Sequence, residues 1–198
     1  VFLYLIYRLI KFLQPKEVRQ EEQRILSHRF YKVSGRGRAS YLILCLEEAL
    51  LFYGQDFSDW ERILRELWSV TSRSEGDWIG NWLDSVGELL SDRILTTAPP
   101  FSDDIREIRD LYTRFGTKMI LVNALMENAY TMVCEWSPDT VAHNPDSLHF
   151  IDEAEEMMEK WGVPLPADEA VRFLLTQKDF SLGKPFDGLR LSHLSKES

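Results

Sequence analysis

Residues Ser40–Leu95 decide the fold, because SYLILCLEEALLFYGQDFSDWERILRELWSVTSRSEGDWIGNWLDSVGELLSDRIL predicts three consecutive helices. The first of them, Tyr41–Tyr53, is apolar on nearly every side, since only Glu47 and Glu48 interrupt it. A helix that is apolar all round is normally covered by neighbours on most of its surface. We therefore predict that this helix lies at the centre of a helical bundle.

The second and third helices each carry one apolar stripe that contains tryptophan. Ser58–Glu61 has the spacing of a capping box and is expected to open the second helix, which carries Trp60 and Trp68. A similar start precedes Trp78 and Trp82 in the third helix. Apolar residues that recur three and four positions apart share one helix face. We expect all four tryptophans to be structural.

Helical periodicity recurs through most of the remaining chain. Further segments of this kind lie at 16–32, 105–115, 117–136, 150–161 and 167–177. Pro99 and Pro100 interrupt the pattern, so residues 96–102 form a connector and a possible subdomain joint. From Lys178 onward the apolar residues have no helical period, which indicates an irregular C-terminal strap. The prediction is all-α: residues 1–198 form a single multi-helix bundle of roughly seven to eight helices.

The chain is acidic, and its charge is unevenly distributed. The formal net charge is −9, and residues 54–198 hold fourteen Lys and Arg against twenty-seven Asp and Glu, whereas residues 1–53 hold nine against five. This balance disfavours nucleic acid as the main partner and favours a basic protein. The alternating glycines and arginines at Gly35–Arg38 indicate an interhelix turn, with RNA contact as the alternative.

The segment 150–161 divides into an apolar side and an acidic side. Phe150, Ile151, Ala154, Met157, Met158 and Trp161 are expected to face inward. The outward residues are Asp152, Glu153, Glu155, Glu156 and Glu159, with Lys160 as the lone base. Carboxylates at this density repel one another on a helix. A solvated face is one interpretation; a surface for a basic partner is the functional one.

Two other polar features break apolar helices. Glu47 and Glu48 are expected either to reach solvent at one edge or to place one carboxylate in a groove. A second polar stripe, with residues spaced by four, consists of Asn123, Glu127, Thr131 and Glu135. It is either solvent-facing surface or a polar groove, in which Glu127 would be an acid, a base or a partner contact.

The first thirteen residues, VFLYLIYRLIKFL, are too short to span a bilayer as a helix, which takes about 20 apolar residues. Two readings remain: a terminal helix folded back on the core, or an anchor in the membrane interface with Arg8 and Lys11 at its basic edge. We expect no transmembrane segment. Cys45 and Cys134 lie in apolar helical segments, as buried thiols of a cytoplasmic protein do, with a disulfide as the alternative.

Specific catalytic motifs are missing from the sequence: it has no Gly-rich phosphate loop, nucleophile elbow, Cys₂/His₂ spacing or HExxH helix. His143 and His149 lie in a segment, 137–149, that is predicted to be a loop. His149 with Glu153 and Glu156 has a spacing compatible with a metal, but the pattern is common by chance. We expect no enzyme, no cofactor and no bound metal.

The succession GRASYLILCLEEAL, DWERILRELWSVTS and DWIGNWLDSVGELL resembles small helical immunity proteins of bacterial polymorphic-toxin systems, over about residues 36–95. The resemblance implies a cytoplasmic inhibitor that binds one cognate toxin and occludes it. We therefore expect a protein-binding module whose candidate contacts are the five acids of segment 150–161, Asn123 and Glu127. The alternative is a helical scaffold or regulatory subunit, apposed to a membrane through its first helix.

Overall fold

The computed structural model describes residues 16–72, 110–111, 119–134, 146–179 and 182–195, and over these ranges the protein is helical. The helices are α2 (Lys16–Ser27), α3 (Gly35–Phe52), α4 (Phe57–Ser69), α8 (Met119–Cys134), α10 (Asp146–Trp161), α11 (Asp168–Leu174) and the short 3-10 helices η2 (Leu189–Leu191) and η3 (His193–Ser195). In these ranges the extended pairing is limited to one isolated bridge, Val33 with Lys178. The all-α bundle is confirmed, with six α-helices in the described part against the seven to eight predicted for the whole chain.

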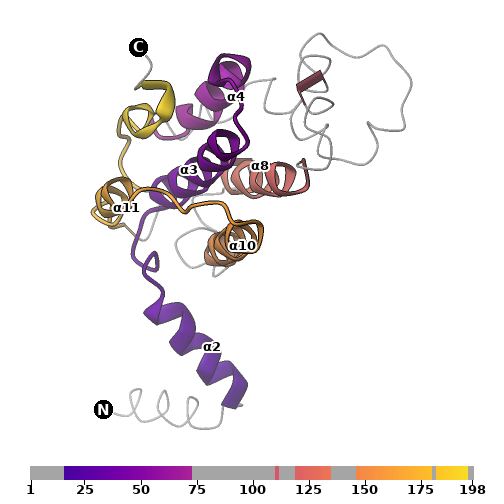
Figure 1. Ribbon diagram of the computed structural model, residues 1–198. Helices are drawn as coiled ribbons and strands as arrows, with labels where there is room; N and C mark the ends of the chain where they lie inside the picture. The colour runs from indigo at the N-terminus through magenta and orange to yellow at the C-terminus, as the bar shows by residue number, and fades with distance from the viewer. Residues whose placement is uncertain (1–15, 73–109, 112–118, 135–145, 180–181, 196–198) are drawn as a thin grey trace.

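Helix α3 is the centre of the bundle, as its all-round apolar sequence predicts. Figure 1 shows α8, α10 and α11 around it, with α4 across its far end. From Ala39 to Leu50 every residue except Glu48 is buried. The buried side chains of α3, α4, α8 and α10 belong to one hydrophobic cluster. Cys45 lies in it as a free, buried thiol.

The start of α3 corrects the prediction of a turn at Gly35–Arg38. The helix already begins at Gly35, and the Ser34 side chain caps it by accepting a hydrogen bond from the Gly37 N–H at 3.3 Å. A Cβ on Gly37 would lie 2.5 Å from the Val33 side chain, so the glycine here permits close packing. The two glycines therefore do not mark a chain break.

The two arginines of the segment Gly35–Arg38 are buried and have structural roles. Arg36 donates to the carbonyl oxygens of Gly183 (3.1 Å) and Val70, and Arg38 donates to those of Phe30 (3.2 Å) and Tyr31 (2.7 Å) and to Ser147 Oγ (2.5 Å). Burial lowers the pKa of Arg38 to about 10. Both side chains tie distant loops to the central helix, so they are not available for RNA contact.

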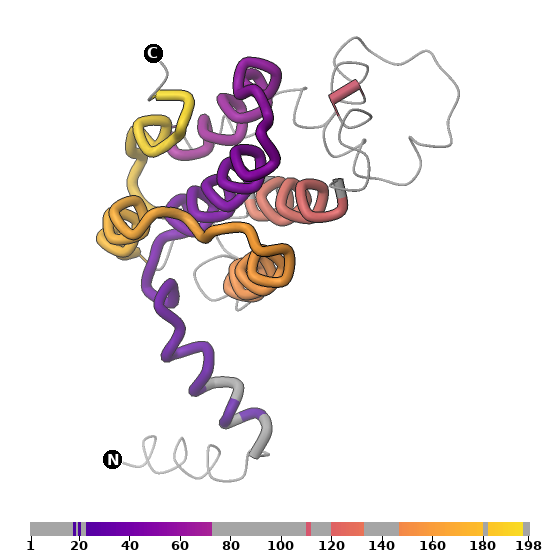
Figure 2. Tube along the Cα trace, in the orientation of Figure 1, coloured from indigo at the N-terminus to yellow at the C-terminus, as the bar shows by residue number. Residues whose placement is uncertain are grey.

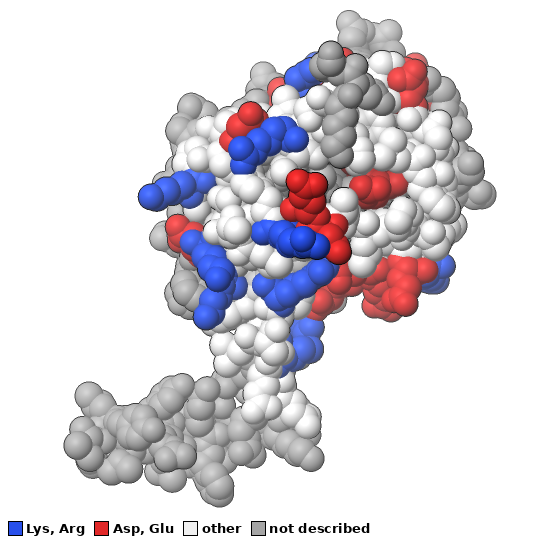
Figure 3. Space-filling model, turned by 60° about the vertical axis from the view of Figure 1, so that its left-hand side comes forward, with Lys and Arg blue, Asp and Glu red and all other residues white. Residues whose placement is uncertain are grey.

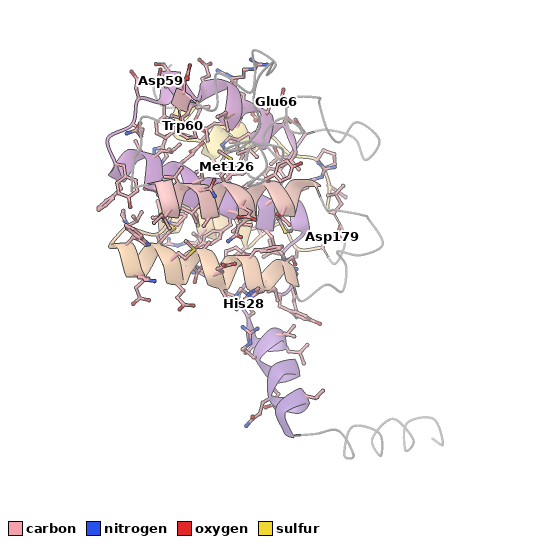
Figure 4. All side chains as sticks on the ribbon, turned by 90° about the vertical axis from the view of Figure 1, so that its right-hand side faces the viewer. His28, Asp59, Trp60, Glu66, Met126 and Asp179 are labelled. Atoms are coloured by element: carbon pink, nitrogen blue, oxygen red, sulfur yellow. The ribbon has the colours of Figure 1, made fainter. Side chains whose placement is uncertain are left out.

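Helix α4 packs both of its tryptophans, Trp60 and Trp68, into the core, as their place on its apolar stripe predicts. Trp60 and Trp68 are each 1% exposed. The cap is Asp56, which accepts from the Ser58 N–H at 2.9 Å, so the helix begins at Phe57, two residues earlier than a capping box with Ser58 as its cap predicts. In the side-chain view of Figure 4, Trp60 and Met126 both lie within the body of the bundle.

Helix α2 extends away from the bundle, and we call it the arm (Figures 1 and 2). Val18 and Leu26 are 43% and 55% exposed, while Ile25 packs against the core. The arm ends at Ser27 rather than continuing to Lys32 as predicted, because the chain turns there so that Phe30 and Val33 can enter the core.

The C-terminal segment 182–195, which we call the strap, runs beside α11, α4 and α3, as predicted for an irregular tail. Leu182 and Leu194 are buried. Hydrogen bonds from Phe186 N–H to Thr71 O (2.8 Å) and from Gly188 N–H to the Thr71 side-chain Oγ1 (3.1 Å) fix its middle part.

Several predictions fall outside the described residues: the helix with Trp78 and Trp82, the joint at 96–102, the first thirteen residues, His143 and Glu135. The side chain of Cys134 is not described either. Among the helices that the structure does describe, none combines the length and the apolar character needed to cross a membrane.

Candidate functional site

Four carboxylates form an acidic ladder along one face of α10: Asp152, Glu155, Glu156 and Glu159. Their spacing of three, one and three residues is that of a single helical face. The helix begins at Asp146, within the segment predicted to be a loop, so its first turn includes Ser147 and Leu148, both buried. Ile151, Ala154 and Met158 are buried, which fixes the rotation of α10 about its own axis and places the ladder on a different face from these three residues.

The first ladder carboxylate, Asp152, already binds basic groups of the same chain. Arg24 Nη1 donates to its Oδ2 at 2.5 Å, and His28 Nε2 lies 2.9 Å from its Oδ1. His28 Nδ1 accepts the Phe30 N–H at 3.1 Å, so the imidazole carries its proton on Nε2 and donates it to Asp152. Figure 4 shows His28 at the junction between arm and bundle.

The second ladder carboxylate, Glu155, is bound on the same side. Arg29 and the Tyr41 hydroxyl both donate to Glu155 Oε1, Tyr41 at 2.7 Å, and Arg29 also donates to Tyr41 Oη at 3.0 Å. Burial raises the pKa of Tyr41, so the phenol stays protonated and remains a donor. The five acids were predicted to face outward; Asp152 and Glu155 are only 34% and 28% exposed, because basic residues 124 and 126 positions away reach them.

The second half of the ladder is open. Glu156 and Glu159 are exposed and Glu153, on a neighbouring face, is half-buried. Within the described ranges no hydrogen bond or ion pair reaches these three carboxylates. Figure 3 shows acidic side chains gathered where the arm leaves the bundle, with basic side chains next to them.

Trp161, which was predicted to face inward, is 37% exposed. It is the last residue of α10, and Gly162, with a φ of 70°, turns the chain away. Leu165, 44% exposed, follows in the same connection. The helical period correctly places Met158 in the core, but it cannot show that the bundle stops short of Trp161. Sequence reasoning therefore missed an aromatic group at the end of the acidic helix.

The described part of the polar stripe on α8 is at least partly exposed to solvent. Glu127 is exposed, and Asn123 and Thr131 are half-buried. The buried polar residue of this helix is Asn128, which the sequence did not single out; its Nδ2 lies 3.5 Å from Phe150 O. His149 is exposed, and the described residues contain no group of His, Cys, Asp and Glu arranged to hold a metal.

A buried carboxylate cluster joins α3, α4 and the strap, and it corrects both expectations for Glu47. The Glu47 side chain is fully buried: Trp68 Nε1 (2.7 Å) and Ser192 Oγ (2.5 Å) donate to Oε1, and the His193 N–H (2.9 Å) donates to Oε2. Glu48 pairs with His193 Nε2 at 3.1 Å. We call these five residues the Glu47 cluster; it is neither a solvent edge nor a groove, because the strap covers it.

Comparison of the chain with family models, with curated proteins and with solved structures gives no significant match. The candidate site is therefore defined by its own charges and contacts. Its parts are the acidic ladder, with two carboxylates held by the chain and two open, and the exposed Trp161 at the end of the same helix.

Proposed function

We propose that this protein is a stoichiometric protein-binding module, an immunity protein that occludes the basic surface of a cognate bacterial toxin. The observation that supports the proposal is the acidic ladder, because Asp152 and Glu155 pair with arginines of the same chain, while Glu156 and Glu159 have no such pair among the described residues. The net charge of −9 and the resemblance over about residues 36–95 support the same proposal.

The mechanism is occlusion guided by charge. Carboxylates on one face attract a basic partner over a distance set by the Debye length, about 10 Å at 0.1 M salt. The final contact then depends on desolvated anchors, for which exposed tryptophan is a preferred residue type. Trp161, the exposed last residue of α10 and two residues after Glu159, is the candidate for such an anchor.

The decisive first experiment is copurification with the toxin domain encoded by the gene immediately upstream. We expect one complex of 1:1 stoichiometry by size-exclusion chromatography with light scattering, and loss of the toxin activity within it. If no complex forms, or if the upstream genes encode membrane or metabolic proteins that bind instead, the scaffold or regulatory alternative is favoured.

Reversing the open ladder charges should slow association with that partner. Glu156→Lys with Glu159→Lys should reduce the association rate at least about tenfold at low salt, because electrostatic steering raises such rates by at least that factor. Both side chains are exposed, so folding should be unaffected. Stopped-flow rates across a salt series measure the effect.

The matched control carries the same charge change on another part of the surface. Glu169→Lys with Asp187→Lys alters two exposed acids on α11 and the strap. If this control slows association equally, net charge alone governs the rate and the ladder is not the binding face.

Trp161→Ala should weaken the complex without unfolding the protein. Truncation of a tryptophan anchor at an interface costs about 2 kcal/mol or more of binding free energy, roughly a thirtyfold loss of affinity. The ring is already 37% exposed, so the melting temperature should change little. Calorimetric titration gives the affinity, and a large loss of thermal stability with unchanged affinity would make Trp161 a structural residue.

A further inference from the structure

We propose that the arm, through Arg24, competes with basic partners for the acidic ladder, so that a partner must displace Arg24 in order to engage Asp152 together with the open Glu156 and Glu159. This inference rests on the proposed function and adds a regulatory contact to the same site. In the closed state seen here, Arg24, His28 and Arg29 occupy Asp152 and Glu155.

The arm is held at its C-terminal end. Arg24 lies in the last turn of α2, and His28 and Arg29 follow directly after the helix. Of the other described arm side chains, Ile25 packs against the core, whereas Val18 and Leu26 are mostly exposed. An isolated helix of 12 residues is marginal in water, so the contacts at its C-terminal end contribute to the order of α2.

The contacts that hold the arm are ones that a basic partner can replace. The side chains of Arg24 and Asp152 are 50% and 34% exposed, and those of Arg29 and Glu155 are 45% and 28% exposed. Ion pairs in contact with water contribute little to stability. An incoming arginine that binds Asp152 therefore exchanges one such pair for another.

The segment that can leave the bundle when the arm is displaced ends before Phe30. Phe30 and Val33 are buried in the core, and the Ser34 N–H donates to Gln177 O at 2.7 Å, so the chain is fixed from Phe30 onward. Arg29 also lies over the rings of Phe30 and Tyr41, 5.0 and 5.5 Å from their centroids, which holds it to the body. Displacement therefore releases Arg24 and α2, with the hinge at Ser27–His28.

A binding site that is covered for part of the time has a lower apparent affinity, in proportion to the fraction that is open. Removing the arm contact should therefore raise the affinity of the ladder for basic ligands. Arg24→Gln is the variant that tests this, since the Arg24 side chain is 50% exposed and reaches α10 through Asp152. Lys184→Gln, an equal charge change at an exposed strap residue, is the matched control.

The probe is a fluorescent octa-arginine peptide titrated against the full chain at low salt. We expect Arg24→Gln to bind it about threefold to tenfold more tightly than Lys184→Gln, the factor for an arm that covers the ladder about 70–90% of the time. The gain should disappear when Asp152→Asn is added. Equal affinities of Arg24→Gln and Lys184→Gln would overturn the inference.

Hydrogen exchange of the free protein gives a second readout that needs no ligand. The amides of α2 should exchange faster in Arg24→Gln than in Lys184→Gln, while those of α3 stay protected. Unchanged exchange in α2 would also overturn the inference, because Arg24 would then not hold the arm. If both readouts are positive but the toxin encoded upstream fails to bind, the proposed function alone is wrong.

Discussion

Trp68→Ala should lower the free energy of unfolding by about 3–5 kcal/mol, the usual cost of truncating a buried tryptophan in a core. The ring is 1% exposed and sits between the central helix and the strap, so its removal leaves a cavity in the interior. Its Nε1–H also donates to Glu47 Oε1 at 2.7 Å, and that carboxylate would lose one of its three donors. Urea denaturation followed by circular dichroism measures the change.

Trp68→Phe separates the two parts of this effect. Phenylalanine retains most of the ring volume but has no donor for Glu47, so the loss should be smaller than for alanine. Trp161→Ala is the matched control for an exposed tryptophan and should cost much less stability. If Trp68→Ala left the unfolding free energy unchanged and abolished partner binding, Trp68 would be an interface residue rather than a core residue.

The helical spacing of apolar residues was sufficient to predict the central helix of this protein and a helix that packs against it. The uninterrupted apolar run after Ser40 identified the central helix, and the stripe through Trp60 and Trp68 identified a neighbour that packs on it. These predictions succeed because burial of one face is a local property: residues three and four apart share a face whatever lies opposite.

The predictions that failed depend on residues far away in the chain. Arg36 and Arg38 look like part of a turn until the carbonyl groups that they bind are known, and one of these belongs to Gly183. Asp152 looks free until Arg24 reaches it. Glu47 looks like an edge residue until Ser192 covers it. No local pattern contains such pairings, since polar residues buried in pairs are specified by the tertiary fold.

Glu47→Ala should destabilise the protein by about 3 kcal/mol or more. The carboxylate satisfies the Trp68 indole, the Ser192 hydroxyl and the His193 N–H, and a buried donor left without an acceptor costs about 1–3 kcal/mol. Two of these donors belong to the strap, so the strap should loosen first. Its amides should lose protection from hydrogen exchange in Glu47→Ala before those of α3 and α8 do.

Glu48→Gln is the control, because Glu48 is adjacent to Glu47 and contacts the same strap through His193. Glu48 makes one hydrogen bond to His193, between side chains that are 16% and 22% exposed, so its loss should cost about 1 kcal/mol, less than the loss of the acceptor of three donors. If Glu48→Gln and Glu47→Ala destabilise the protein to a similar extent, the strap is held by the contact between Glu48 and His193 as much as by the buried hydrogen bonds of Glu47.

The dependence on pH tests the burial of Glu47 directly. Burial raises the pKa of this carboxyl above its ordinary value of 4.5, because the charged form loses water. The folded protein then keeps a proton that the unfolded chain has released, so this group contributes most to stability below pH 4.5 and its contribution falls as the pH rises toward the raised pKa. The unfolding free energy of the wild type minus that of Glu47→Gln should accordingly decrease as the pH rises from 4.5 and then level off. A difference that instead grows with pH would show that the three donors outweigh burial and hold the pKa of Glu47 low.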